Sequence, residues 1–405
     1  MEVSFLSSTL CVFKLAENCD ALKLMCEVDK AKSAAKAVKA YTKLISILLE
    51  KGKRLGEYLH DCALFDDNIF MRMNSYNFTN NTDENIVLAA KHDLEVLKLI
   101  SNQTAHEVKA TLAKRFPQHA AGILALPELN SSLVELDWSA ESFAKHAREN
   151  GFGIYARFKA FEFTTRGEIV PIERPDRIRL HELKSYEVQR QKIIDNTEAF
   201  LAGLPASNAL LYGDRGTGKS STVKALLNEY SSQGIRIIQI AKSAVGKLSE
   251  LIRLIEPIAL KFIVFIDDLT FNEDDEDFGV LKAALEGSLI ARPENIVIYA
   301  TTNRRHLVKE SFQSRQGDEV HRADQIDESL SLSDRFGLYI TFSVPARDEY
   351  LRIVEMLATD AKVKMDKEVL LSGAERFALQ RTGRSPRIAR QYIDKVIAIS
   401  GKNKQ

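Results

Sequence analysis

The segment GDRGTGKSS, residues 213–221, is the most specific indication of the fold of this chain. It matches the pattern Gly-x-x-x-x-Gly-Lys-Ser, whose glycines let the backbone curl so that successive N–H groups face an anion. The apolar run NALLYG precedes it and a helix-like segment follows, so the loop leads from a strand into the N-terminus of a helix. Because the positive end of the helix dipole also attracts phosphate, we predict a triphosphate-binding loop.

Individual positions of this loop have expected roles. Lys219 supplies a mobile charge for the outer phosphates, and the hydroxyl of Ser220 is a ligand for Mg²⁺. The alternative is a glycine-rich turn between a strand and a helix, with no ligand. The other residues expected to bind ATP through the loop are Gly213, Gly216, Thr217, Gly218 and Ser221.

Apolar runs continue after the loop and alternate with helix-like stretches: IRIIQI, FIVFID, NIVIYATT and LYITFSV. Strands that alternate with helices form a parallel, doubly wound sheet, so we predict an α/β fold. The expected domains are a mainly helical N-terminal domain (1–150), a β-hairpin and linker segment built from FGIYARFKAFEF and EIVPI (151–205), the sheet domain (206–345) and a helical lid (346–405).

Polar side chains follow two of these apolar runs. Asp267 and Asp268 end one strand, at the carboxyl edge where ligands bind in this architecture. Asp267 is the expected partner of Mg²⁺, and Asp268 is expected to polarise an attacking water, although glutamate reaches one methylene further. Asn303 ends the next strand and is expected to hold that water or contact the γ-phosphate. The alternatives are a solvated strand end and a turn-forming asparagine.

Four motifs in this order, GDRGTGKSS, FIDDL, TTN and SDRFG, resemble the AAA-plus ATPases. The tail segment TGRSPRIARQYID is similar to the sensor-2 helix of that superfamily, especially to that of the Holliday-junction branch-migration motor. On a finer scale, LLYGDRGTGKSSTVKALL, KFIVFIDDLTF and IYATTNRRHLVKE resemble a bacterial AAA-plus family, domain of unknown function 815. The resemblance covers about residues 175–400.

The resemblance implies further roles. Arg335 takes the position of an arginine finger that reaches the ATP site of a neighbouring subunit, which implies a homo-oligomer; the alternative is an ion pair with Asp334 or a lid acid. Arg387 takes the position of sensor 2, and LHELKSYEVQRQ that of the stretch around adenine, so that Tyr186 lines the base. No Asn-Lys-x-Asp guanine reader is present, which favours ATP.

Three functions remain open for such an ATPase. It can remodel or position a protein partner that the N-terminal domain selects, although AKSAVGKLSELIRLIEPIALK lacks the aromatic residue typical of threading loops. It can be a DNA-linked ATPase of the loader, initiator or branch-migration type, or a nucleotide-gated binding switch with slow hydrolysis, for which Asp268 is a hint. The DNA hypothesis relies on a basic tail with Arg381, Arg384, Arg387 and Arg390.

The bulk composition limits the partners. Lysine plus arginine and aspartate plus glutamate both number 56, so the zero net charge gives no whole-chain attraction to nucleic acid or membranes. No run approaches the roughly 20 apolar residues of a membrane span, so we expect a cytoplasmic protein without a membrane partner. No catalytic constellation is expected in 1–150. Its histidines His92, His106 and His119 are expected at the surface, and its cysteines 11, 19, 26 and 62 as free thiols.

Overall fold

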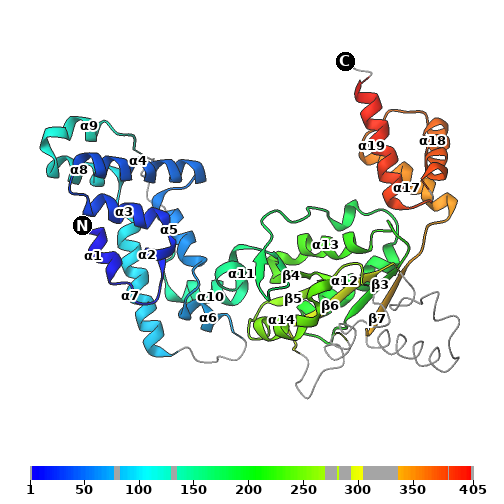
Figure 1. The fold of residues 1–405 in the computed structure, drawn as a ribbon, viewed down its shortest axis with the longest axis horizontal. Helices are drawn as coiled ribbons and strands as arrows, with labels where there is room; N and C mark the ends of the chain where they lie inside the picture. Colours follow the sequence, from blue (N-terminus) through cyan, green and yellow to red (C-terminus); the bar gives the residue numbers. More distant parts are fainter. Residues whose placement is uncertain are drawn as a thin grey trace. The chain divides into compact units, whose positions relative to one another are not determined.

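The computed structural model describes residues 2–76, 83–128, 135–269, 281, 293–303, 336–381 and 383–402. They divide into two compact units (Figure 1). The first comprises 1–158 together with 257–260, and the second comprises 159–256 and 261–405. Arg335, the expected arginine finger, lies outside the described residues.

The first unit is built from helices whose apolar side chains recur at helical spacing. Helix α4 (Ala34–Lys51) buries Tyr41, Leu44 and Leu48 along one side and ends at Gly52, whose φ of 61° suits a helix C-terminus. The other elements are α1 (Val3–Ser8), α2 (Leu15–Asn18), α3 (Asp20–Lys30), α5 (Leu55–Leu64), α6 (Ile69–Asn74), α7 (Glu84–Ser101), α8 (Ala105–Arg115), η1 (Pro117–His119), α9 (Ala120–Leu124), α10 (Ala140–Asn150) and α11 (Gly153–Arg157).

The second unit contains a seven-stranded sheet in the order β2-β1-β4-β5-β6-β3-β7. Every strand pair is parallel except β1–β2, so the predicted parallel α/β architecture is confirmed. The strands are β1 (Ala160–Phe163), β2 (Ile169–Pro171), β3 (Ala209–Gly213), β4 (Ile235–Ile240), β5 (Lys261–Ile266), β6 (Ile296–Thr302) and β7 (Leu338–Phe342).

Helices α12 (Glu187–Leu201) and α13 (Lys219–Tyr230) cover one face of this sheet. Their apolar side chains, such as Ile193 and Leu226, join alternate residues of the strands in a single core. The strand residues of opposite orientation, such as Val264, are buried as well. Burial on both faces explains why these strands are continuous apolar runs rather than alternating patterns. Shorter elements complete the unit: η2 (Leu180–Glu182), η3 (Ser231–Gln233), η4 (Lys242–Lys247) and α14 (Leu248–Ile255).

The region 151–171 differs from the sequence prediction in two ways. The first half of FGIYARFKAFEF is helix α11, not strand, so the β-rich interpretation was wrong for residues 153–157. Strands β1 and β2 do form the expected hairpin, but β1 also pairs in parallel with β4, which places the hairpin in the same sheet as the phosphate loop. Strand pairing depends on residues far away in the chain, which local sequence does not report.

Three helices follow the sheet and form the lid: α17 (Arg347–Asp360), α18 (Lys367–Gln380) and α19 (Pro386–Lys402) (Figure 1). Their buried faces share a separate apolar core that includes Tyr350, Ala374 and Tyr392. In the part of the chain described here, no helix combines the length and the apolar character needed to cross a membrane.

Candidate nucleotide site

The phosphate loop connects β3 to α13, as the sequence predicts, and its shape depends on glycine. Gly213 has a φ of 127°, and a Cβ atom there would lie 2.2 Å from the main-chain oxygen of Phe342 on β7. Gly218, with a φ of 99°, is the N-cap of α13, so Lys219 and Ser220 begin that helix. Thr217 is buried and donates from its hydroxyl to the carbonyl of Asp214 at 2.8 Å. The loop therefore presents a helix N-terminus, which favours anions.

Lys219 is held at the centre of the loop. Its Nζ donates to the carbonyls of Gly213 (2.8 Å) and Asp214 (2.7 Å) and to Oδ1 of Asn303 (3.1 Å). Burial lowers the pKa of Lys219 to about 8, and the nearby carboxylates, Asp214 foremost, partly oppose this effect. An anion placed in this loop would add to the negative charge that the carboxylates already supply to this ammonium.

Asp267 lies against the start of α13. Its Oδ1 accepts hydrogen bonds from the hydroxyls of Ser220 and Thr301, each at 2.6 Å. Strands β5 and β6 are neighbours, so their carboxyl ends bring Asp267 and Thr301 together. A carboxylate and a serine hydroxyl are oxygen ligands of the kind Mg²⁺ prefers, and their contact fits a shared ion. Thr301 was not among the predicted site residues, although its place at the end of an apolar strand is the same signal that led to Asn303.

Asp268 adopts an unusual backbone conformation and is linked to Asn303. Its φ is 53°, and its N–H donates to the hydroxyl of Thr301 at 3.0 Å. Its Oδ1 accepts a hydrogen bond from Nδ2 of Asn303 at 2.6 Å. Asn303 therefore connects Lys219, through its oxygen, to Asp268, through its nitrogen. The sequence predicted Lys219, Asp268 and Asn303 as separate site residues. The structure brings them together, joined by hydrogen bonds through Asn303.

A cavity of about 670 Å³ contains these groups, and residues of α12 and the lid also line it. Tyr186 lines it, and its hydroxyl donates to the carbonyl of Ser343 at 2.7 Å. Burial raises the pKa of Tyr186 to about 12. Ile353 and Leu357 of α17 add apolar surface. The volume lies in the range of about 300–1,000 Å³ usual for small-molecule sites.

Helix α19 approaches the phosphate loop directly. The N–H of Arg387 donates to the carbonyl of Gly216 at 3.1 Å, and both Arg387 and Arg390 line the cavity. Arg190 of α12 lines it as well, and burial lowers the pKa of its guanidinium. Sequence reasoning assigned no nucleotide role to Arg190 or Arg390. The available signal was their spacing, since Arg190 lies one helical turn after Tyr186 and Arg390 one turn after Arg387.

A family model described as "Protein of unknown function (DUF815)" matches residues 156–400, more than half of the chain. Proteasome-activating nucleotidase 1 of Haloferax volcanii is 26% identical over an alignment of 214 residues, and the match covers 46% of this chain and 51% of that protein. The chain thus spans about half the length of this curated relative.

Among solved structures, the Thermotoga maritima RuvB Holliday junction branch migration motor matches with a TM-score of 0.40 and 16% identity, over 56% of this chain and 66% of that one. Another RuvB structure, a single-residue mutant, matches with the same TM-score and 17% identity over the same shares. The chain belongs to the DUF815 family, and its parallel sheet, with the glycine-rich loop between β3 and α13, forms a P-loop domain.

Proposed function

We propose that this protein binds ATP with Mg²⁺ and hydrolyses the bond to its terminal phosphate. The observation that carries the proposal is the chain of contacts from Lys219 through Asn303 to Asp268, at the same sheet edge as the pair Ser220–Asp267. One arrangement thereby joins a cation for phosphate, an oxygen pair for a metal ion and a carboxylate for a water molecule. Separate structural roles would not require these groups to converge.

Ser220 and Asp267 would hold Mg²⁺, which supplies charge neutralisation between the outer phosphates when it is bound. Lys219 would exchange its contacts with the loop carbonyls for phosphate oxygens. Asp268, with Asn303 beside it, would orient a water molecule and accept its proton. Arg387 and Arg390 of the lid would contact the phosphates, while Tyr186 would lie near the base.

A nucleotide-gated binding switch is the second candidate function, and one observation favours it. Asp268 is bonded to Asn303 at 2.6 Å and has a φ of 53°, so its carboxylate is engaged before any water is bound. The contact occupies Oδ1, so Oδ2 would have to accept the proton from a water molecule. Slow hydrolysis, with the bound state as the functional signal, is consistent with that geometry.

As the macromolecule on which this ATPase acts, we favour a protein over DNA. Two of the lid arginines that motivated the DNA hypothesis, Arg387 and Arg390, line the nucleotide cavity although they are exposed. The Arg381 guanidinium lies 5.6 Å from the Phe377 ring centroid, and Arg384 lies 4.0 Å from Glu375. The identity of a relative as a proteasome-activating nucleotidase supports the same choice. We infer an oligomeric ATPase that remodels or positions a protein chosen by the N-terminal unit.

The test measures ATP binding and turnover in the wild type and in Lys219→Ala. We expect the variant to bind ATP at least about a hundredfold more weakly, because charge-assisted hydrogen bonds contribute about 1.5–3 kcal/mol each. Lys224→Ala, on the same helix and outside the cavity lining, serves as the matched control. Unchanged binding in Lys219→Ala would contradict the site. If the wild type binds ATP tightly but hydrolyses it no faster than the uncatalysed reaction, the nucleotide-gated binding switch is the better description.

A further inference from the structure

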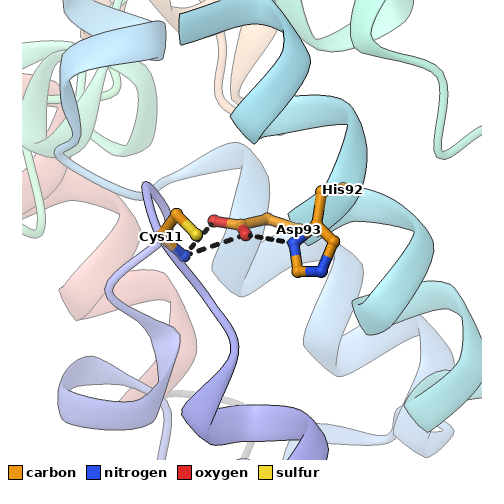
Figure 2. A group of neighbouring side chains, drawn as sticks. All are labelled: Cys11, His92 and Asp93. Carbon is orange, nitrogen blue, oxygen red and sulfur yellow. Dashed lines mark hydrogen bonds and ion pairs between the residues drawn. The ribbon is translucent and has the colours of Figure 1, made fainter. Parts of the chain in front are cut away.

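A second group of chemically reactive side chains lies in the first unit, far along the sequence from the phosphate loop. Figure 2 shows Cys11, His92 and Asp93, each of which offers one potential ligand atom, and these atoms all lie within 4.8 Å of one another. Cys11 precedes α2, whereas His92 and Asp93 are consecutive residues of α7. The fold, not the sequence spacing, therefore brings the thiol to the other two groups.

Asp93 is the rigid part of this group. Its carboxylate is fully buried, and its oxygens accept the main-chain N–H groups of Cys11, Val12 and Phe13 at 2.6–2.9 Å. These bonds fix the orientation of the carboxylate and also hold the turn that carries the cysteine. Supporting hydrogen bonds of this kind are what orient the ligands of protein metal sites.

Cys11 and His92 are the accessible part. Both are exposed, and the thiol donates to the carbonyl of Thr9 at 3.3 Å. His92 is exposed, as the sequence predicted. Its Nδ1 nevertheless lies 3.1 Å from Oδ1 of the buried Asp93. Figure 2 shows Nε2 pointing away from Cys11, so the ring is not placed as a base between the thiol and the carboxylate.

The distance between Nδ1 of His92 and Oδ1 of Asp93 suits two ligands of one metal ion. Two ligand atoms 3.1 Å apart, each about 2.0–2.1 Å from one ion, subtend an angle of about 100°, close to the tetrahedral value. Cys11 is exposed and can bring its sulfur closer by rotation about its Cα–Cβ bond. The alternative is a simple hydrogen bond, in which a proton occupies the position between Nδ1 and Oδ1.

We propose that Cys11, His92 and Asp93 bind a divalent transition-metal ion of the zinc class. Sulfur, nitrogen and oxygen together are the ligand set of Zn²⁺, whereas Ca²⁺ and Mg²⁺ take oxygen ligands. On binding, the thiol gives up its proton to solvent, and the thiolate and carboxylate together balance the two charges of the ion. Three protein ligands leave one coordination position for water.

The experiment titrates the full-length protein, first freed of metal with a chelator, with Co²⁺ as a coloured probe for Zn²⁺. We expect one equivalent to produce the intense visible bands of a tetrahedral site and a thiolate-to-cobalt charge-transfer band, both removed by added Zn²⁺. In Cys11→Ser the charge-transfer band should be lost, and in His92→Gln the affinity should fall at least about tenfold. Cys62→Ser and His106→Gln are matched controls outside the group and should behave as the wild type.

Asp93 is left unchanged, because its substitution would also release the N–H groups of residues 11–13. Thermal unfolding supplies a second measurement, in which Zn²⁺ should raise the midpoint of the wild type but not those of Cys11→Ser and His92→Gln. The proposal is overturned if no thiolate band forms, if the band survives in Cys11→Ser, or if Zn²⁺ shifts the wild type and both variants equally or not at all.

Discussion

At the scale of single residues, the lowered pKa of Lys219 predicts how the site responds to an anionic ligand. Burial lowers its pKa to about 8, so the loop holds an ammonium whose charge the surrounding protein only partly compensates. The carboxylates of Asp214, Asp267 and Asp268 act in the opposite direction. A polyphosphate adds several negative charges at close range and must raise this pKa when it binds. Binding and protonation of Lys219 are therefore linked.

This linkage predicts how ATP affinity depends on pH. Below pH 8, Lys219 carries its proton both with and without ATP, and the affinity should be constant. Above pH 8, the free protein loses the proton and must regain it on binding, so the affinity should fall as pH rises, approaching tenfold per pH unit. Calorimetry between pH 7 and 10, in buffers of different ionisation enthalpy, measures both the affinity and the proton uptake. Lys219→Arg, which keeps its charge throughout, should give a flat profile; an equally flat wild-type profile would contradict the linkage.

At the scale of secondary-structure elements, the close approach of β3 and β7 determines the entry of the phosphate loop. The strands pair in parallel, and Gly213 is opposite Phe342. The N–H of Asp214 donates to the carbonyl of Phe342 at 2.9 Å, and Oδ2 of Asp214 accepts the N–H of Val344 at 2.8 Å. The loop is thus anchored to the edge strand immediately before it turns toward α13, and a side chain at Gly213 would separate the two strands.

Gly213→Ala tests this anchoring. A positive φ costs an alanine about 1–2 kcal/mol, and forcing apart a packed contact adds about 1–3 kcal/mol. Gly203→Ala is the matched control, because Gly203 has a φ of 70° but no atom within 4 Å of an added Cβ. Denaturant unfolding of both variants, following the transition that ATP shifts, should show the larger loss for Gly213→Ala. Equal losses would mean that the contact with Phe342 contributes nothing.

At the scale of the whole molecule, the cavity combines distant parts of the second unit. The phosphate loop after β3, the residues that follow β5, the carboxyl ends of β6 and β7, the start of α12 and the lid helices α17 and α19 all line it. The family resemblance adds Arg335 of a neighbouring subunit, which stays a prediction because it lies outside the described residues. If that prediction holds, one chain alone does not contain a complete catalytic site.

Mixing two inactive variants tests this idea. Arg335→Ala should retain ATP binding but lose turnover by about 10³-fold or more, as for other arginine fingers. Asp268→Asn should also be inactive, because it lacks the base. In a mixed ring, roughly a quarter of the interfaces would pair an intact Asp268 with an intact Arg335, and activity should partly return. Each variant at the same total concentration is the control. No recovery at any mixing ratio would support a structural role for Arg335 within its own chain.

Local sequence was sufficient for the elements that carry the nucleotide site. The strands β3 to β7 are where continuous apolar runs predicted them, because burial on both faces of a parallel sheet requires such runs. The lid helices also lie where the sequence predicted helices. The glycine pattern also predicted the loop, since a backbone with positive φ against a neighbouring strand admits no larger residue at Gly213. Helix α11 was missed because its five residues include none of the usual capping signals.

The folded chain was needed to show which side chains meet. Local patterns were enough to predict that Lys219, Asp267, Asp268 and Asn303 end or begin elements at one edge of a sheet. They did not predict that Asn303 joins Lys219 to Asp268. They likewise offered Cys11 as a free thiol and His92 as a surface residue, with no relation between them, and the fold places both beside the buried Asp93. Periodicity reports which face of an element is buried, whereas a contact between residues far apart depends on how the elements pack, and single-sequence patterns do not encode that packing.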